Sequence, residues 1–162
     1  MSLIRKALST DIEKIIRIYN SLVGTPGCTW DMDYPNIDDV KNDFAKDALY
    51  VYCEENNIIG VAAAGKDDEL EHLDCWNKDI KNPCDLARIG VVSEYQGQGV
   101  AKELINYIEK DVVLKGFDGI HFLVSKTNPR ALNLYNSLNY KNVGETIMYE
   151  KEWFCYEKKL SN

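Results

Sequence analysis

The sequence lacks long apolar runs and the cysteine and histidine patterns of metal or disulfide sites. No window of about 18 residues is free of polar side chains, so no membrane-spanning helix is expected. The five cysteines are odd in number and form no CxxC pair, and there are only two histidines, so neither a disulfide framework nor a zinc site is indicated. Residues 1–7 carry no apolar stretch after their basic residues, so no secretory signal is expected. We therefore expect a soluble, cytoplasmic protein with reduced thiols and no bound metal.

Basic residues are in the minority: 19 Lys and Arg against 26 Asp and Glu give a net charge of -7. Nucleic-acid-binding proteins normally present a basic stripe to the phosphate backbone, so a nucleic-acid partner is not expected. An acidic protein attracts cations, so small cationic molecules or basic peptide ends suit it better as partners. The length of 162 residues and the hydrophobic content of 45% fit a single domain over residues 1–162.

Hydrophobic periodicity predicts a mixed order of strands and helices. The expected strands are 3–7, 49–53, 58–64, 86–92, 120–124, 140–150 and 152–159, and the expected helices are 12–23, 36–44, 100–115 and 128–138. The spacing of Thr10 and Glu13 predicts a capping box at the first helix, and Asn128 before Pro129 predicts the start of the last helix. Residues 66–83 are predicted to form a loop or a short helix. Antiparallel hairpins followed by a β-α-β unit indicate the α/β (α+β) class, with helices packed on a largely antiparallel sheet.

Two glycines that follow the strand at 86–92 indicate an anion-binding turn. Gly97 and Gly99 allow a turn whose N–H groups point one way, and a helix starting at Val100 adds unpaired N–H groups and the positive end of its dipole. A dinucleotide-binding fingerprint is excluded because Lys102 stands where its third glycine is needed. A Walker-type phosphate loop is absent from the sequence as well. Taken alone, the glycines are also compatible with a plain tight connection.

Two stretches resemble the GNAT superfamily of N-acetyltransferases. The stretch 91–101 resembles the family's acetyl-CoA signature Gln/Arg-x-x-Gly-x-Gly/Ala, which here is Gln96-x-x-Gly99-x-Ala101. The stretch 128–140 resembles the family's Asn-x-x-Ala-x-x-Leu-Tyr-x-x-x-Gly-Phe block, with Asn139 and Tyr140 in place of the glycine and the phenylalanine. Asparagine also adopts the left-handed conformation, so the first replacement is tolerable. The two blocks occur in the family's order and are far more specific together than either is alone.

The resemblance implies a GNAT-like fold, with a mixed, mostly antiparallel central sheet of about seven strands flanked by about four helices and splayed at strands 4 and 5. It implies an N-acetyltransferase that uses acetyl-CoA as co-substrate. The acetyl group would pass directly to a primary amine of a small molecule or peptide in a ternary complex. No metal is implied, and a homodimer is compatible with the resemblance although no stretch of the sequence indicates one.

The resemblance also assigns roles to individual residues. The implied cofactor-binding residues, most of them acting through the main chain, are Ile89, Gly90, Val91, Gln96, Gly97, Gln98, Gly99, Val100, Ala101, Lys102 and Asn128. Tyr135 is implied as the general acid that protonates the departing CoA thiolate, an ordinary core tyrosine being the alternative. The implied wall of the acceptor site consists of Trp30, Asp31, Asp33 and Tyr34. Aromatic rings and carboxylates suit a cation, and a solvated loop with one anchoring tryptophan is the alternative.

The general base stays open. Some members of the family place a glutamate on the strand before the Asn block, where this sequence has Leu123. His121 shares that face of the strand by alternation, and Glu71, His72 and Asp85 are further candidates. The missing glutamate leaves a second function open, that of a CoA-binding sensor or interaction module without turnover. A third interpretation, an acyl-transfer enzyme with a Cys–His nucleophile, would need an acetylated cysteine.

Overall fold

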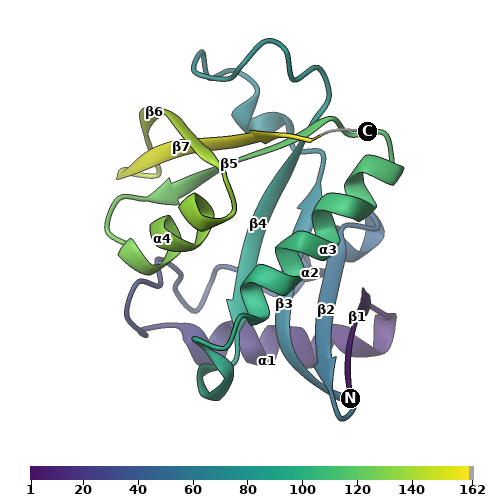
Figure 1. Ribbon diagram of the computed structural model, residues 1–162. Helices are drawn as coiled ribbons and strands as arrows, with labels where there is room; N and C mark the ends of the chain where they lie inside the picture. The colour runs from purple at the N-terminus through teal and green to yellow at the C-terminus, as the bar shows by residue number, and fades with distance from the viewer. Residues whose placement is uncertain (161–162) are drawn as a thin grey trace. The chain divides into compact units, whose positions relative to one another are not determined.

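The computed structural model describes residues 1–160, whose sheet has seven strands in the order β1-β2-β3-β4-β5-β7-β6 (Figure 1). The strands are β1 (Ser2–Lys6), β2 (Leu49–Glu54), β3 (Asn57–Gly65), β4 (Pro83–Val91), β5 (Gly119–Ser125), β6 (Lys141–Met148) and β7 (Lys151–Lys159). The helices are α1 (Ile12–Leu22), α2 (Ile37–Ala45), α3 (Val100–Leu114) and α4 (Pro129–Ser137). Strand β4 is parallel to β5, and the pairs β1–β2, β2–β3, β5–β7 and β6–β7 are antiparallel. The predicted fold class, a mixed and mostly antiparallel sheet with helices, is confirmed.

The chain divides into two compact units. The first holds Met1–Gly65 and Ala87–Ile108, and the second holds Lys66–Leu86 and the residues from Glu109 onward. Strand β4 and helix α3 therefore contribute residues to both units. The assignment of one domain to residues 1–162 stays a prediction. None of the helices within residues 1–160 is long and apolar enough to cross a membrane.

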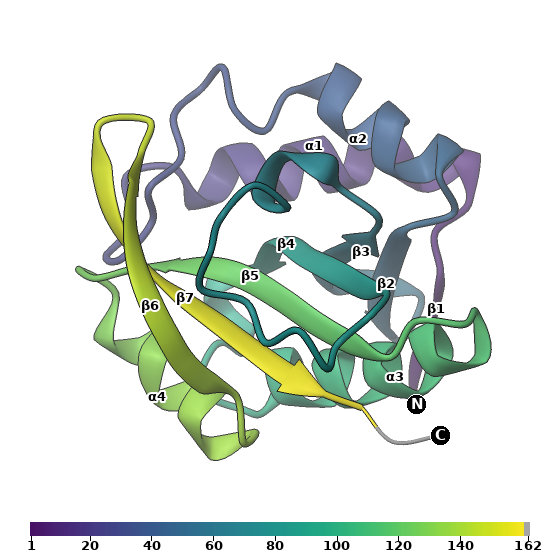
Figure 2. The same cartoon turned by 90° about the horizontal axis from the view of Figure 1, so that it is seen from above.

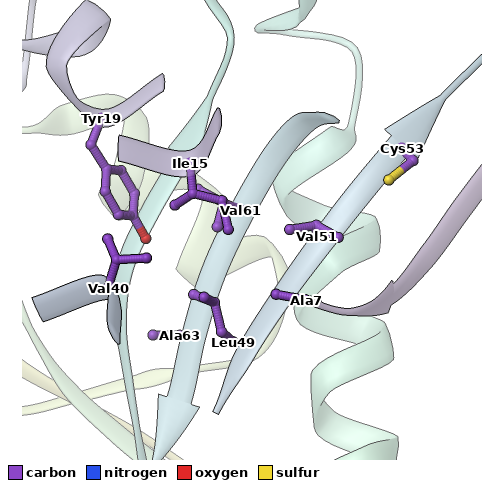
Figure 3. Packing of buried hydrophobic residues seen from close by; sticks show 9 residues of the cluster. All are labelled: Ala7, Ile15, Tyr19, Val40, Leu49, Val51, Cys53, Val61 and Ala63. Atoms are coloured by element: carbon purple, nitrogen blue, oxygen red, sulfur yellow. The ribbon is translucent and has the colours of Figure 1, made fainter. Parts of the chain in front are cut away.

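The core of the first unit lies where α1 and α2 pack on β2 and β3. Strand alternation sends every second side chain of β2 toward these helices, as Figure 3 shows. The buried cluster consists of Ala7, Ile15, Tyr19, Val40, Leu49, Val51, Cys53, Val61 and Ala63. The opposite face of β3 meets the start of α3, where a Cβ added to Gly60 would lie 2.8 Å from Cγ1 of Val100. This close packing fixes the beginning of α3 against the sheet.

Local sequence signals explain two of the connections in the first unit. The turn between β2 and β3 has positive φ at Glu55 (50°) and Asn56 (70°), as the hairpin turns that match strand twist require. Oδ1 of Asn36 accepts hydrogen bonds from the N–H groups of Asp38 (2.9 Å) and Asp39 (3.1 Å) at the start of α2. The predicted hairpin is therefore confirmed, and the helix expected at 36–44 begins with Asn36 as its cap.

The predicted capping box of Thr10 and Glu13 is wrong. A 3-10 turn, Ser9–Asp11, precedes α1, and the buried carboxylate of Asp11 takes over the capping role. It accepts hydrogen bonds from the N–H of Leu8 and from Nη1 of Arg5, both at 2.7 Å. Asp11 replaces Thr10 as the capping residue because a carboxylate with an ion pair and an N–H donor makes stronger hydrogen bonds than an exposed threonine hydroxyl does.

The second unit is built on β5, β7 and β6, with α4 on one face. Phe122 and Tyr135 are in contact there, with ring centroids 4.5 Å apart. Asn128 caps α4 by accepting from the N–H of Ala131 (3.2 Å), and Asn139 has a φ of 70° after the helix, so both predictions for this block are confirmed. The pairs between β4 and β5 run only from Pro83–Gly119 to Asp85–His121, which agrees with strands that splay.

Residues 66–82 cover the opposite face of the second unit, and we call them the 66–82 segment. Apart from the 3-10 turn Asp68–Leu70 it has no regular structure, so the predicted loop or short helix proves to be mainly a loop. Figure 2 shows it crossing β5 and β7. A Cβ added to Gly119 of β5 would lie 2.5 Å from Cγ2 of Ile80, and the N–H groups of Lys81 and Asn82 each donate to the Asp118 carboxylate at 2.8 Å. The end of the segment is thus anchored on β5.

Candidate functional site

The glycine turn before α3 has the backbone that the sequence predicts. Gly97 and Gly99 have φ angles of 79° and 83°, in the left-handed region that glycine adopts at little cost. A Cβ added at either glycine would meet no atom within 4 Å. Glycine is therefore required by the backbone conformation, and open space adjoins the turn.

The first N–H groups of α3 have no acceptor within the helix, as in any α-helix. At the start of this helix, the N–H of Glu103 donates a hydrogen bond to the carbonyl of Gly99 (3.0 Å). The amides of residues 100–102 belong to the unpaired first turn, where the helix dipole is positive. Nε2 of Gln96 donates to the carbonyl of Val91 (3.0 Å) and so ties the turn to the end of β4. Main-chain donors and a positive helix end together suit phosphate oxygens.

The last residues of β4 lie directly before this turn. Gly90 faces α1, where an added Cβ would lie 2.9 Å from Cδ1 of Leu22, so packing explains the need for glycine there. Ile89 and Val91 are half-buried. The N–H of Val92 donates to the carbonyl of Ile59 at 2.9 Å. A cofactor contact through residues 89–91 stays a prediction.

Tyr135 lies on the buried side of α4, in the aromatic cluster of the second unit. Its ring contacts Phe122, and the Tyr156 ring lies 6.3 Å away. Burial raises the pKa of Tyr135 well above its usual range. The phenol is therefore protonated at physiological pH, as a proton donor must be.

The predicted acceptor residues form an ordered loop in the first unit. The Trp30 ring packs edge-on against Tyr19, with centroids 5.1 Å apart. Asp31 and Asp33 are exposed, and the N–H of Asp33 donates to Oδ1 of Asp31 at 2.8 Å. The hydroxyl of Tyr34 accepts from Nη1 of Arg88 at 3.0 Å. Trp30 and Tyr34 thus anchor the loop and leave the two carboxylates in solvent.

Arg88 organises this region and was not identified from the sequence. Its Nε and Nη2 donate to the Asp43 carboxylate at 2.6 Å and 2.7 Å, and its carbonyl accepts from the Tyr19 hydroxyl at 2.8 Å. Burial lowers the pKa of Arg88, but the bonds to Asp43 outweigh it and the net shift is upward. Asp43 lies 45 residues earlier in the chain, so no local pattern reveals the pair.

We expect Arg88→Met to lower the free energy of unfolding by about 3 kcal/mol, because it leaves a buried carboxylate without its cation. The Asp43 side chain is only 4% exposed. The double variant Arg88→Met/Asp43→Leu removes both charges and should recover most of that loss. Urea unfolding measures both effects, and a single variant as stable as the wild type would contradict the importance of the pair.

The four candidates for the general base have different surroundings. Glu71 is held by Lys66, with Nζ 2.6 Å from Oε1, and His72 is exposed. His121 and Asp85 are both buried, and Nε2 of His121 is in ion-pair contact with Oδ1 of Asp85. The structure thus brings together two candidates that lie 36 positions apart in the sequence.

The stability of the fold should depend on the ionisation of Asp85. Burial raises the pKa of Asp85 from 3.8 to about 6, because contact with His121 offsets only part of the desolvation. The stabilisation from the bound proton is therefore full below pH 3.8 and is lost as the pH rises through about 6. Asp85→Asn, neutral at every pH, should match the wild type near pH 4 and exceed its unfolding free energy at pH 8 by up to about 3 kcal/mol. Urea titrations at both pH values measure the difference, and a less stable variant at pH 8 would contradict the expectation.

Several solved structures resemble the chain over almost its whole length. An N-acetyltransferase of Staphylococcus aureus is 19% identical, with 99% of both chains covered and a TM-score of 0.77. A ribosomal-protein-alanine N-acetyltransferase of Brucella melitensis is 17% identical, with 98% of this chain and 99% of that chain covered and a TM-score of 0.78. A Salmonella typhimurium protein solved with its cofactor acetyl-CoA is 16% identical, with 100% of this chain and 95% of that chain covered and a TM-score of 0.77. At these identities the likeness shows the fold.

Sequence comparison gives the family. An acetyltransferase of Pectobacterium atrosepticum is 29% identical over 70 residues, which cover 40% of this chain and 50% of that protein. The chain thus spans about half the length of this curated relative. The model of the acetyltransferase (GNAT) family matches residues 15–140, a range that includes the glycine turn and the Asn128–Tyr140 block. The chain belongs to the acetyltransferase (GNAT) family.

Proposed function

We propose that this chain is an N-acetyltransferase that moves the acetyl group of acetyl-CoA to a primary amine of a small molecule or peptide. The observation that carries the proposal is the turn at Gly97 and Gly99, whose left-handed glycines adjoin open space and precede the first turn of α3, where the amides have no partner within the helix. Membership of the acetyltransferase family supports it. The Salmonella typhimurium structure with acetyl-CoA has the same fold.

The turn fits the pyrophosphate of acetyl-CoA. A Cβ at Gly97 or Gly99 would occupy the open space beside the turn, so glycine keeps the main chain accessible to the phosphates. In the proposed complex the amides of residues 97–102 hold the pyrophosphate. Residues 89–91 bind the pantetheine arm through the main chain, and Asn128 contacts the cofactor while it caps α4. Acetyl-CoA supplies the acetyl group as a thioester, which is already activated toward amines.

The proposed chemistry is direct transfer. The amine nitrogen must lose its extra proton before it attacks the thioester carbonyl carbon, because an ammonium has no lone pair. The carbon–sulfur bond then breaks, and we assign to Tyr135 the proton that the sulfur receives. Burial raises the pKa of the Cys84 and Cys155 thiols to about 12, so neither supplies a thiolate nucleophile at neutral pH. An acyl-enzyme at either of these two thiols is therefore not favoured.

We propose that the acceptor carries a positive charge. Trp30, Asp31, Asp33 and Tyr34 form the proposed wall of the acceptor site, and its two carboxylates are exposed. An indole face and carboxylates both attract a cation. The net charge of -7 acts in the same direction. Polyamines, aminoglycosides, amino acids and basic peptide N-termini are the compounds to test.

The proposal is tested by the release of free CoA from acetyl-CoA in the presence of this panel of amines. We expect at least one amine to increase CoA release in proportion to enzyme concentration, with mass spectrometry showing one acetyl group added to its nitrogen. Tight acetyl-CoA binding without release for any amine would instead indicate a CoA-binding sensor or interaction module. The replacement of the family's glutamate by Leu123 is the feature that makes this outcome worth testing.

A further inference from the structure

The second unit contains a buried acid–base pair that the family motifs do not explain. Asp85 of β4 is 6% exposed and His121 of β5 is 3% exposed. Nε2 of His121 is in ion-pair contact with Oδ1 of Asp85. Within residues 1–160, neither of these atoms nor Oδ2 of Asp85 has a hydrogen-bond partner of normal geometry. Two titratable groups are thus buried in contact with each other, and their facing polar atoms have no other hydrogen-bond partner among residues 1–160.

Strand register places the pair in a row of polar side chains on one face of the sheet. Asp85 is paired with His121, and His121 is paired with Glu157 of β7. The 66–82 segment contacts this row at two points. The Trp76 ring lies over the His121 ring, with centroids 4.3 Å apart, and the N–H of Asn77 donates to Oε1 of Glu157 at 2.8 Å. Glu157 therefore has a main-chain partner, whereas the Asp85 carboxylate depends on His121.

Burying this acid–base pair lowers the stability of the fold. A functional role would explain why the pair is present. Burying a carboxylate costs several kcal/mol, which a neighbouring imidazole repays only in part. Hydrophobic residues of similar size would pack between β4 and β5 without that cost. Buried titratable groups in contact with a specific charge partner are candidates for functional sites. The glutamate that some members of the family use as base is also missing, because Leu123 stands at its position.

We propose that His121 is the general base of the proposed acetyl transfer and that Asp85 is its positioning residue. The inference rests on the proposed function. Nδ1 of His121 accepts one proton from the acceptor's ammonium, directly or through one water, and the neutral amine then forms its bond to the acetyl carbon. CoA leaves with a proton on sulfur, the new amide nitrogen gives up its second proton to restore that proton donor, and the imidazolium returns its proton to solvent. Each turnover thus converts an ammonium and a thioester into an amide, a thiol and one released proton.

The contact between His121 and Asp85 determines which ring nitrogen of His121 can accept a proton from the acceptor. The tautomer of a histidine is set by the hydrogen bond that its other nitrogen makes. Because Nε2 faces the Asp85 carboxylate, the neutral ring carries its proton on Nε2 and leaves the lone pair on Nδ1. An imidazolium formed in turnover is then stabilised by the adjacent carboxylate, as in other His–Asp pairs.

Other charged groups near the pair already have partners or act on it only through space. Lys66 and Asp67 of the 66–82 segment influence the Asp85 carboxylate, with opposite signs. Glu71 is bound by Lys66 at 2.6 Å, and Glu157 by the N–H of Asn77. Cys84 lies beside Asp85 on β4, and its buried thiol stays protonated because its pKa is raised to about 12. His121 is therefore the group in this row that is suited to take a proton.

The first arm of the test uses His121→Gln, with His72→Gln as the matched control on an exposed histidine. With an alkylamine acceptor from the panel, we expect His121→Gln to lower kcat/KM about 100-fold at pH 7 and to leave the acetyl-CoA Kd unchanged. The ratio of wild-type to variant rates should fall as the pH rises, because more of the amine is then already neutral. A merely structural histidine would give a ratio that does not change with pH. His72→Gln should keep the wild-type profile.

The second arm does not depend on activity. The chain has two histidines, so 15N-labelled imidazole signals are assigned with His72→Gln alone. We expect the Nε2–H tautomer at His121 in the wild type, and Asp85→Asn should change the tautomer populations while lowering kcat/KM. An Nδ1–H tautomer in the wild type would overturn the inference whatever the activity.

The outcomes separate the two proposals. If the wild type acetylates an amine and His121→Gln has the same kcat/KM, the inference is overturned and the proposed function stands. A wild type that binds acetyl-CoA and acetylates no amine overturns the proposed function, and the inference with it. A pH-dependent loss in His121→Gln together with the Nε2–H tautomer supports both.

Discussion

Gly99→Val should weaken acetyl-CoA binding by at least tenfold, which corresponds to about 1.4 kcal/mol. The φ of 83° at Gly99 costs a residue with a side chain about 1 to 2 kcal/mol, and more for a β-branched one. An added Cβ meets no protein atom within 4 Å, so the turn will either distort or project the new methyl groups into the space proposed for the pyrophosphate. Titration calorimetry with acetyl-CoA measures the loss.

Gly116→Val is the matched control for this variant. Gly116 also has a positive φ, 97°, and an added Cβ there likewise meets no atom within 4 Å. It follows the end of α3, so its replacement imposes a similar backbone strain without touching the glycine turn. We expect a comparable loss of stability with an unchanged Kd for acetyl-CoA. An equal loss of affinity in both variants would mean that strain, and not the proposed cradle, explains the effect of Gly99→Val.

Tyr135→Phe should lower kcat about 100-fold and leave the acetyl-CoA Kd within about twofold of the wild type. The ring is retained, so its packing against Phe122 at 4.5 Å is preserved and only the proton donor is lost. Steady-state rates with a panel amine and calorimetry with acetyl-CoA separate the two quantities. Equal losses in turnover and in affinity would contradict the role of general acid.

Tyr156→Phe provides the control for hydroxyl removal in the same aromatic cluster. Its hydroxyl donates to Oδ1 of Asn136 at 3.1 Å, and no catalytic role is proposed for it. We expect a loss of about 1 kcal/mol in unfolding free energy and a kcat close to that of the wild type. A kcat that falls as far as in Tyr135→Phe would point to the cluster as a whole instead of one hydroxyl.

Features with local causes could be predicted from the sequence. Glu55 and Asn56 form the polar hairpin turn, Asn36 and Asn128 cap their helices, and Asn139 adopts a positive φ. In each case the side chain acts on backbone within a few residues, which a single sequence displays. The order of strands and helices could also be predicted, because hydrophobic periodicity can be read within each segment of the sequence.

Features that depend on distant residues could not be predicted. Arg88 forms an ion pair with Asp43, which lies 45 positions earlier in the chain. The contact between Asp85 and His121 depends on the register of β4 with β5. One local prediction failed as well, because the Asp11 carboxylate, bonded to Arg5 and to the N–H of Leu8, replaces the Thr10–Glu13 capping box. The 66–82 segment gave no periodic signal, since its place is fixed by contacts of Trp76, Asn77 and Ile80 with strands elsewhere in the chain.

The glycine turn is the feature on which the proposed function depends, and calorimetric titration of the purified chain with acetyl-CoA tests it most directly. The account predicts saturable binding of one acetyl-CoA per chain with a Kd between about 1 μM and 1 mM, the usual range for enzyme substrates. The absence of binding at millimolar acetyl-CoA, by a protein whose folded state is verified by circular dichroism, would contradict it.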